Sequence, residues 1–157
     1  MRLSLFLFLM TCMISNALAG DISFDISVKI KGSIGVIRES DLIFKDIMAK
    51  SMVQTITVQP KVGDLWGIPA KFTITGTTGL QVDCSITGSA TELISGSSSM
   101  PVGSFRIGDG TGAGDLTYST FLVTGFAEVF VGATLTVAAW QTNGNYSAQQ
   151  TFTVIYH

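Results

Sequence analysis

The sequence predicts an all-β domain, either a sandwich or a barrel. Short runs alternate apolar and polar residues, and glycine, proline or asparagine interrupts them about every eight to twelve residues. No helical pattern extends beyond two turns. Threonine, valine, isoleucine and phenylalanine, which favour strands, are frequent throughout residues 20–157.

Residues 1–19 have the pattern of a secretory signal peptide. Arg2 supplies the positive start, an apolar run follows, and Ala17 and Ala19 have the small-x-small spacing of a cleavage site. The alternative is a membrane anchor, but the apolar run is shorter than the roughly 20 residues that a spanning helix needs. We therefore expect export through the inner membrane, cleavage after Ala19, and one mature domain at residues 20–157.

Residues 21–31 form the clearest predicted strand, and they would stand at the N-terminus of the mature chain. Apolar side chains fall on every second position, with serine, aspartate and lysine between them, so one face is wholly apolar. A terminal strand of this kind pairs with its own sheet or with that of another molecule. The apolar residues are Ile22, Phe24, Ile26, Val28 and Ile30.

The first half of the domain contains four further predicted strands. Residues 32–35 interrupt the alternating pattern after the terminal strand. Residues 49–53 are ambiguous, and a helical turn is one interpretation of them. A loop is expected at residues 63–69, around Trp66. The predicted strands are residues 41–47, 55–59, 70–76 and 79–86.

Cys84 falls on the apolar face of the strand predicted at residues 79–86. It is the one cysteine left after removal of residues 1–19, so an internal disulfide cannot form. We expect a buried, inert thiol with a raised pKa rather than a reactive group.

The second half begins with a Ser/Gly-rich stretch at residues 88–99, which predicts a surface loop. Asn143 and Gly144 form a strong hairpin signal, because both residues tolerate positive φ. The return strand at residues 150–156 would place Phe152, Val154 and Tyr156 on one face. Further strands are predicted at residues 100–107, 116–123, 126–131 and 133–140.

The sequence offers little for catalysis, and we expect no enzyme activity, cofactor or resident metal. The sole histidine, His157, stands at the chain end, where fraying would prevent a triad or a metal cluster from being held. A pair of carboxylates stays formally open, since glycosidases need only two.

The glycine-rich stretch at residues 109–115 is expected to be a solvated loop between strands. A dinucleotide-binding loop would need a helix after it, and a calcium site would need more oxygen ligands than Asp109 and Asp115 supply. The formal net charge of −2 becomes −3 once Arg2 is removed, so nucleic acid is not an expected partner.

Four aromatic residues near predicted loops raise the alternative of a carbohydrate-binding platform. Core or edge packing is the preferred explanation for isolated aromatics in a β protein of this size. The residues are Trp66, Tyr118, Trp140 and Tyr146.

The C-terminal stretch resembles the C-terminal signature of chaperone–usher pilus subunits. It combines an alternating apolar strand, a penultimate tyrosine at Tyr156, and a glycine at the fourteenth position from the end, Gly144. More broadly, the chain resembles a bacterial family of secreted, pilin-like β-sandwich domains over most of its mature length, although it lacks the cysteine pair of the best-known pilins. The matching stretches are residues 42–44, 70–76, 100–102, 130–135, 144–146 and 153–156.

The resemblance implies an immunoglobulin-like or pilin-like antiparallel sandwich that lacks its last strand. A hydrophobic groove would lie beside the C-terminal strand, with Gly144, Phe152, Val154 and Tyr156 at its acceptor edge. A periplasmic chaperone would fill the groove first. The N-terminal strand of another copy, or of a related pilin subunit, would then replace it at an outer-membrane usher.

The resemblance therefore implies a structural subunit of a fimbria on the surface of a Gram-negative bacterium, which passes through the periplasm. The alternative is a self-complemented secreted adhesin or carbohydrate-binding domain that recognises a host or surface glycan.

Overall fold

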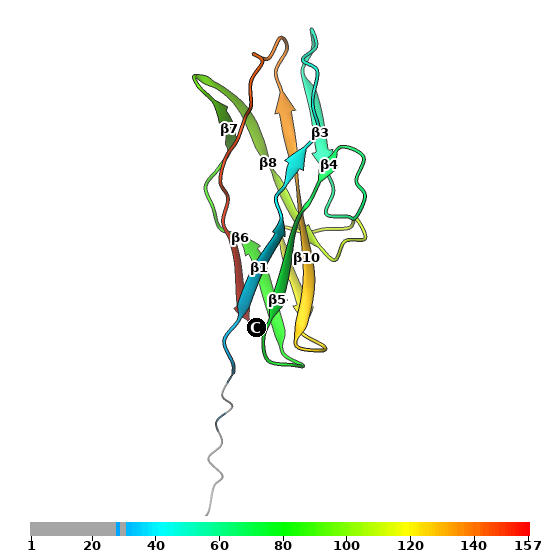
Figure 1. The fold of residues 1–157 in the computed structure, drawn as a ribbon, viewed down its shortest axis with the longest axis vertical. Helices are drawn as coiled ribbons and strands as arrows, with labels where there is room; N and C mark the ends of the chain where they lie inside the picture. Colours follow the sequence, from blue (N-terminus) through cyan, green and yellow to red (C-terminus); the bar gives the residue numbers. More distant parts are fainter. Residues whose placement is uncertain (1–27, 29–30) are drawn as a thin grey trace, which may run out of the picture. The chain divides into compact units, whose positions relative to one another are not determined.

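The structure is a computed structural model that describes Val28 and residues 31–157 (Figure 1). The chain divides into two units, Met1–Ile30 and Lys31–His157, and the second contains the fold. The predicted signal peptide and four predicted donor residues, Ile22, Phe24, Ile26 and Ile30, lie outside the described residues. Within the described part there is no helix of the length and hydropathy required to cross a membrane.

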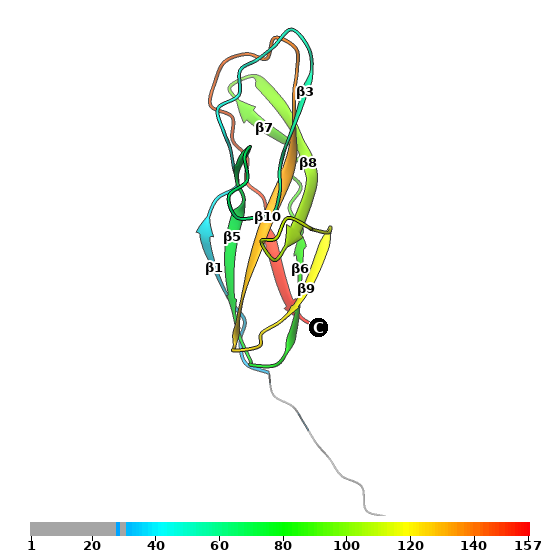
Figure 2. The same ribbon diagram turned by 90° about the vertical axis from the view of Figure 1, so that its right-hand side faces the viewer.

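The described residues form antiparallel sheets and contain no helix, which confirms the predicted all-β sandwich (Figures 1 and 2). The strands are β1 (Gly35–Ser40), β2 (Ile43–Phe44), β3 (Gln54–Val58), β4 (Gly67–Ile68), β5 (Ala70–Thr75), β6 (Gln81–Ile86), β7 (Glu92–Ser95), β8 (Ser98–Gly108), β9 (Thr117–Phe121), β10 (Phe126–Val137) and β11 (Phe152–Tyr156).

Two sheets make up the layers of the sandwich. The large sheet has the order β1-β5-β10-β8-β7, and β3 also pairs with β10. The small sheet has the order β11-β6-β9, and β2 and β4 form a separate two-stranded ribbon. Every pair of these strands is antiparallel.

Strand β10 runs the length of the large sheet and defines its two ends. We call the end at Phe126 the base, where the β5–β6 and β9–β10 loops meet and the Gly76 amide donates to the Gly125 carbonyl at 2.9 Å. We call the end at Val137 the tip, where the Trp140 amide donates to the Lys50 carbonyl at 2.8 Å.

Gly132 allows β10 to change partners along one edge. Residues 126–131 pair with β5 and residues 133–137 pair with β3. At the change, a Cβ on Gly132 would collide with the Val58 carbonyl oxygen, because the end of β3 passes directly beside it. A glycine is therefore required here for the close approach of two backbones.

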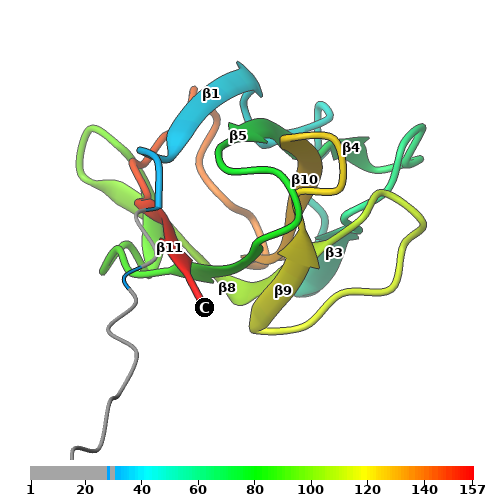
Figure 3. The same ribbon diagram turned by 90° about the horizontal axis from the view of Figure 1, so that it is seen from below.

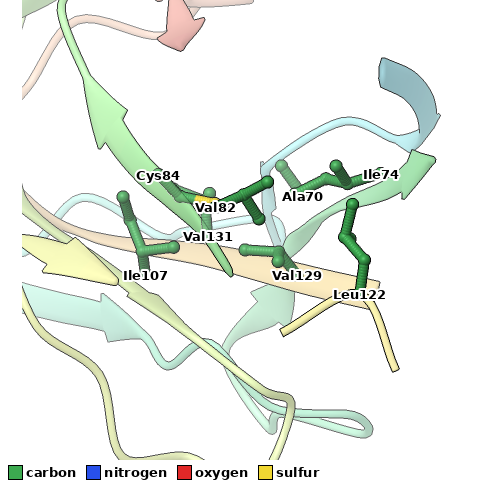
Figure 4. Packing of buried hydrophobic residues seen from close by; sticks show 8 residues of the cluster. All are labelled: Ala70, Ile74, Val82, Cys84, Ile107, Leu122, Val129 and Val131. Carbon is green, nitrogen blue, oxygen red and sulfur yellow. The ribbon is translucent and has the colours of Figure 1, made fainter. Parts of the chain in front are cut away.

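The core consists of two clusters along β10. Alternate residues of this strand point inward, as the period of two requires, and Leu42 and Phe105 contact both clusters. Cluster one, nearer the base, comprises Ala70, Ile74, Val82, Cys84, Ile107, Leu122, Val129 and Val131 (Figure 4). Cluster two, nearer the tip, comprises Ile56, Met100, Val102, Ala133, Leu135 and Val137.

Several strand predictions are correct. Those at residues 55–59, 70–76, 79–86, 100–107, 116–123 and 150–156 correspond to β3, β5, β6, β8, β9 and β11. Cys84 is fully buried in cluster one, as expected from its place on the apolar face.

Other predictions are wrong, chiefly at sheet edges. Strand β1 lies where no strand was expected, because both of its faces are largely exposed and its sequence does not alternate. The strand predicted at residues 41–47 is reduced to β2, and residues 49–53 contain no helical turn. The predicted loop at residues 63–69 contains β4.

The Ser/Gly-rich stretch at residues 88–99 is also not a simple loop. It contains β7 and the start of β8, which pair as a hairpin. The strands predicted separately at 126–131 and 133–140 are one strand, β10, because Gly132 lies inside the ladder. The hairpin predicted at Asn143–Gly144 does not form, because β10 and β11 belong to different sheets.

Candidate functional site

The two sheets meet in an open seam between β1 and β11. Among the described residues, β1 pairs only with β5 and β11 only with β6, so each strand has one edge without a described partner. Viewed along the sandwich from the base, the strands form a ring in which β1 and β11 lie on the same side (Figure 3). On the other side the sheets are joined, because Ile107 and Asp115 exchange two backbone hydrogen bonds of 2.8 and 3.0 Å. Within the part of the chain that the structure describes, the seam is therefore the place where paired strands do not close the ring.

A groove of about 1400 Å³ follows this seam from its middle to the tip. Its floor is apolar and includes side chains from both core clusters, and its rim is formed largely by polar residues 87–90 and 141–151. The apolar lining residues include Leu42, Phe44, Ile47, Phe72, Ile86, Leu93, Phe105, Leu135 and Phe152.

An aromatic stack marks the middle of the seam. Phe72 of β5 and Phe152 of β11 have ring centroids 4.2 Å apart and an interplanar angle of 17°. The stack joins the large sheet to the small sheet, and both rings also line the groove. Stacking of this kind adds to the stability that burial of the two rings provides.

At the base, the seam is held by a set of contacts that we call the clasp. The Tyr156 hydroxyl accepts a hydrogen bond from the Thr77 amide at 2.8 Å, and the Gly32 amide donates to Thr77 Oγ1 at 2.8 Å. Lys31 Nζ donates to the His157 carbonyl at 3.1 Å and lies 5.3 Å from the centre of the Tyr156 ring. The Tyr156 hydroxyl also donates to Thr77 Oγ1 at 3.4 Å, and hydrogen bonding with the side chain and then the amide of Thr77 lowers the pKa of Tyr156. The clasp fixes the point at which the chain enters the domain, beside the end of β11.

The predicted acceptor residues lie along this seam. Phe152, Val154 and Tyr156 share one face of β11, are partly buried and pack against cluster one, while Ile155 points outward and is exposed. Gly144 lines the groove at the tip, where an added Cβ would lie 2.5 Å from Ser95 Oγ. Among the predicted donor residues, only Val28 belongs to the described part.

Sequence reasoning did not identify most of the groove floor. Leu42 and Phe44 alternate in the strand predicted at residues 41–47, so a signal for one inward face was present. Phe105 and Leu135 carry no local signal for a groove, because the topology alone brings β8 and β10 beneath it.

Asp83 and His157 hold each other in local structural contacts at the end of the chain. His157 does not fray: its Nδ1 lies 2.8 Å from Asp83 Oδ2, and its amide donates to the Gln81 carbonyl at 3.1 Å. Hydrogen bonds from Ser119 and then from His157 lower the pKa of Asp83. Among the residues described, no three His, Cys, Asp or Glu side chains gather in a way that would hold a metal ion.

The glycine-rich loop at residues 109–115 connects β8 to β9, as expected for a loop between strands. Asp109 Oδ1 accepts hydrogen bonds from the amide and the hydroxyl of Thr111, at 3.0 and 2.7 Å, which lowers the pKa of Asp109. The carboxylate is therefore engaged in shaping its own turn.

The four aromatic residues considered for sugar binding have different environments. Tyr118 is partly buried against cluster one and Tyr146 against cluster two, whereas Trp140 and Trp66 are exposed. A shallow hollow of about 370 Å³ adjoins Trp66. Beneath it, buried Asp64 accepts a hydrogen bond from the Trp66 amide at 2.8 Å and fixes the loop that carries the indole.

Comparison with known proteins identifies one family. Residues 34–156 match the family described as "Domain of unknown function (DUF4402)". No curated protein and no solved structure matches the chain.

Proposed function

We propose that this chain, which belongs to the DUF4402 family of domains of unknown function, is a structural subunit of a fimbria-like surface fibre assembled by donor-strand complementation. The observation that carries the proposal is the apolar groove that continues the seam between β1 and β11 toward the tip, beside strand edges that have no partner among the described residues. An apolar groove beside a free strand edge is the arrangement that accepts an added β-strand.

The dimensions of the groove favour a polypeptide over a small molecule. Its volume of about 1400 Å³ exceeds the roughly 300–1,000 Å³ of ordinary ligand pockets. The rim residues that precede β11 extend the acceptor edge, since Ser147 already pairs through its backbone with Ile94 of β7. Residues 147–156, which include β11, are nearly as long as the predicted donor strand at residues 21–31.

Strand direction favours a donor from a second copy. Strand β11 runs from the middle of the domain to the base, so an antiparallel partner must run from base to tip. The chain's own N-terminal segment is joined to the domain at the base through Lys31, and in its own groove it would run parallel to β11. A donor from another copy enters at the tip and runs antiparallel, as every other strand pair of the described sheets does.

Five apolar donor side chains would then occupy the groove, namely Ile22, Phe24, Ile26, Val28 and Ile30. Burying them at about 1.5–3 kcal/mol each sets an upper bound of about 8–15 kcal/mol before the cost of ordering the strand. A shift by one residue would turn the polar face inward, so the register is strongly specified.

The same proposal includes the route and partners of assembly. After export and loss of residues 1–19, a periplasmic chaperone covers the groove, and an outer-membrane usher exchanges it for the next subunit's strand. The subunit then becomes part of a fibre at the cell surface. Its role is structural and adhesive rather than enzymatic.

A peptide-binding experiment tests the groove directly. We expect a variant lacking residues 21–31 to bind a synthetic peptide of residues 21–31, measured by fluorescence anisotropy. An Ile26→Asp peptide should bind at least about a hundredfold more weakly, because it buries an unpaired charge. A Ser27→Asp peptide is the matched control and should lose much less affinity. Equal loss with both peptides would refute the proposed facing of the strand, and no binding of the unmodified peptide would refute the groove as its acceptor.

A self-complemented, carbohydrate-binding domain is the second candidate. The hollow beside Trp66 favours it, because an exposed indole next to Thr55, Gln59 and Lys61 combines a stacking surface with polar side chains. On a glycan array this candidate predicts binding that Trp66→Ala abolishes. Silence of the unmodified protein on the array would remove it.

A further inference from the structure

Exposed apolar side chains gather at both ends of the sandwich, outside the groove. At the tip, the neighbouring loops at residues 45–53 and 138–142 carry an apolar surface, which we call the tip patch. Its members are Met48, Met52, Val53 and Trp140, which are 84, 67, 62 and 76% exposed. Clustered exposure of this kind marks a surface for interaction.

At the base, the β9–β10 connection carries a second apolar surface, which we call the base patch. Leu122 is buried in cluster one, but the residues around it point outward. The members are Phe121, Val123 and Phe126, which are 57, 73 and 52% exposed. The two patches lie at opposite ends of β10, so one copy of the domain cannot cover either patch with the other.

We infer that the tip patch of one copy binds the base patch of the next copy in the fibre. The inference rests on the proposed function, and the partner is a second copy of this chain. Ten extended residues span roughly 33 Å, and the proposed acceptor edge at residues 147–156 also has ten residues, so a donor strand of residues 21–30 would leave no length for a spacer between the two domains.

The clasp makes this connection short. Lys31 and Gly32 are bonded to the base of their own domain, at the His157 carbonyl and at Thr77 Oγ1. A donor strand that ends at residue 30 and enters its acceptor at the tip therefore brings the base of its own domain against that tip. The contact is heterologous, since different surfaces meet, and it repeats from copy to copy along a fibre.

The two patches are apolar at their centres. The side chains that define both patches are uncharged, and the apolar area that they remove from water provides the attraction, while exposed Lys50 between Met48 and Met52 keeps its charge at the edge of the contact. Because the donor strand joins the base of one domain to the tip of another, it would not bring two tips or two bases together. The contact therefore sets how consecutive subunits are oriented.

Cysteine cross-linking of assembled fibres tests the inference. We would make Trp140→Cys and Val123→Cys as separate variants of the mature chain, residues 20–157, which retains Cys84 but not Cys12, and assemble them alone and as an equal mixture under a mild oxidant. The native thiol does not interfere, because Cys84 is fully buried and its pKa is raised to about 12. We expect disulfide-linked dimers in the mixture and none in either variant alone.

The possible outcomes separate the contact from the strand exchange. Heat-sensitive polymers that form without the cross-link would overturn the inference and leave the proposed function standing. A failure of the unmodified chain to form any polymer would overturn both. Cross-linking of a single variant with itself would also overturn the inference, because it would show a symmetric contact.

A second measurement uses side-chain truncation. A Met48→Ser/Trp140→Ser variant should give about tenfold less polymer than the unmodified chain at limiting concentration. Leu65→Ser is the matched control, because Leu65 is 75% exposed but lies in the β3–β4 connection. Polymer yields that fall equally in both variants, or in neither, would contradict a specific role for the tip.

Discussion

Cys84 shows how one residue's environment decides its chemistry. It lies fully buried in cluster one, and burial, with a smaller contribution from neighbouring Asp83, raises the pKa of its thiol to about 12. At neutral pH the thiolate, which is the reactive form, is therefore almost absent.

We expect the native thiol to resist a disulfide reagent at pH 8 and to react at once after unfolding in urea. Cys84→Ser should lower the free energy of unfolding by about 1–3 kcal/mol, because it buries a hydroxyl among apolar side chains. Reaction of the folded protein as fast as the unfolded one would show that Cys84 is accessible.

Asp83 connects residue chemistry to the pH dependence of stability. Its pKa is lowered in the folded state by hydrogen bonds from Ser119 and His157. A lowered pKa means that the folded state prefers the charged carboxylate, so this stabilisation is present above the unfolded pKa of about 3.9 and is lost as the pH falls through the folded value.

Urea unfolding at a series of pH values between 7 and 2 tests this effect. We expect the unmodified protein to lose stability on acidification more steeply than Asp83→Asn, which cannot titrate at this position. Superimposable pH profiles for the two proteins would mean that the contacts of Asp83 do not contribute.

At the scale of the elements, the contact between β5 and β11 can be tested by mutation. The Phe72–Phe152 stack joins the two sheets at the middle of the seam. Phe72→Ala and Phe152→Ala should each lower the free energy of unfolding by about 3 kcal/mol. This is the low end of the range for replacing a core phenylalanine by alanine, because both rings are only partly buried.

A double-mutant cycle measures the contact itself. We expect a coupling free energy of about 0.5–1.5 kcal/mol between Phe72 and Phe152. Additive effects of the two substitutions, within error, would show that the rings do not stabilise each other across the seam.

The elements also show how far sequence reasoning reaches. Strands β5, β6 and β11 were predictable because each has one face in the core and therefore alternates. Strand β1 was not, because Val36, Ile37 and their charged neighbours are exposed on both faces of an edge strand. The hairpin signal at Asn143–Gly144 was overridden by topology, which sends β10 and β11 into different sheets.

The same limit applies to the candidate site. The apolar face of β11 was predictable from Phe152, Val154 and Tyr156, and so was the alternation of Leu42 and Phe44. The groove itself was not, because its floor comes from strands far apart in the sequence and its opening depends on which strand edges stay unpaired.

At the scale of the whole molecule, the groove and the clasp have complementary roles. The groove lies open from the middle of the seam to the tip, and the clasp holds the chain's entry point at the base. In the proposed fibre, each domain therefore receives a strand at one end and donates one from the other. This polarity is what allows one kind of subunit to form a chain without a fixed length.

The measurement that tests this account most directly is the assembly state of the mature protein with and without residues 21–31, by unboiled denaturing gel and size-exclusion chromatography. The account predicts a ladder of polymers that collapses on heating and is absent from the deletion variant. A stable monomer that unfolds when residues 21–31 are removed would contradict it, because the strand would then complete its own sandwich.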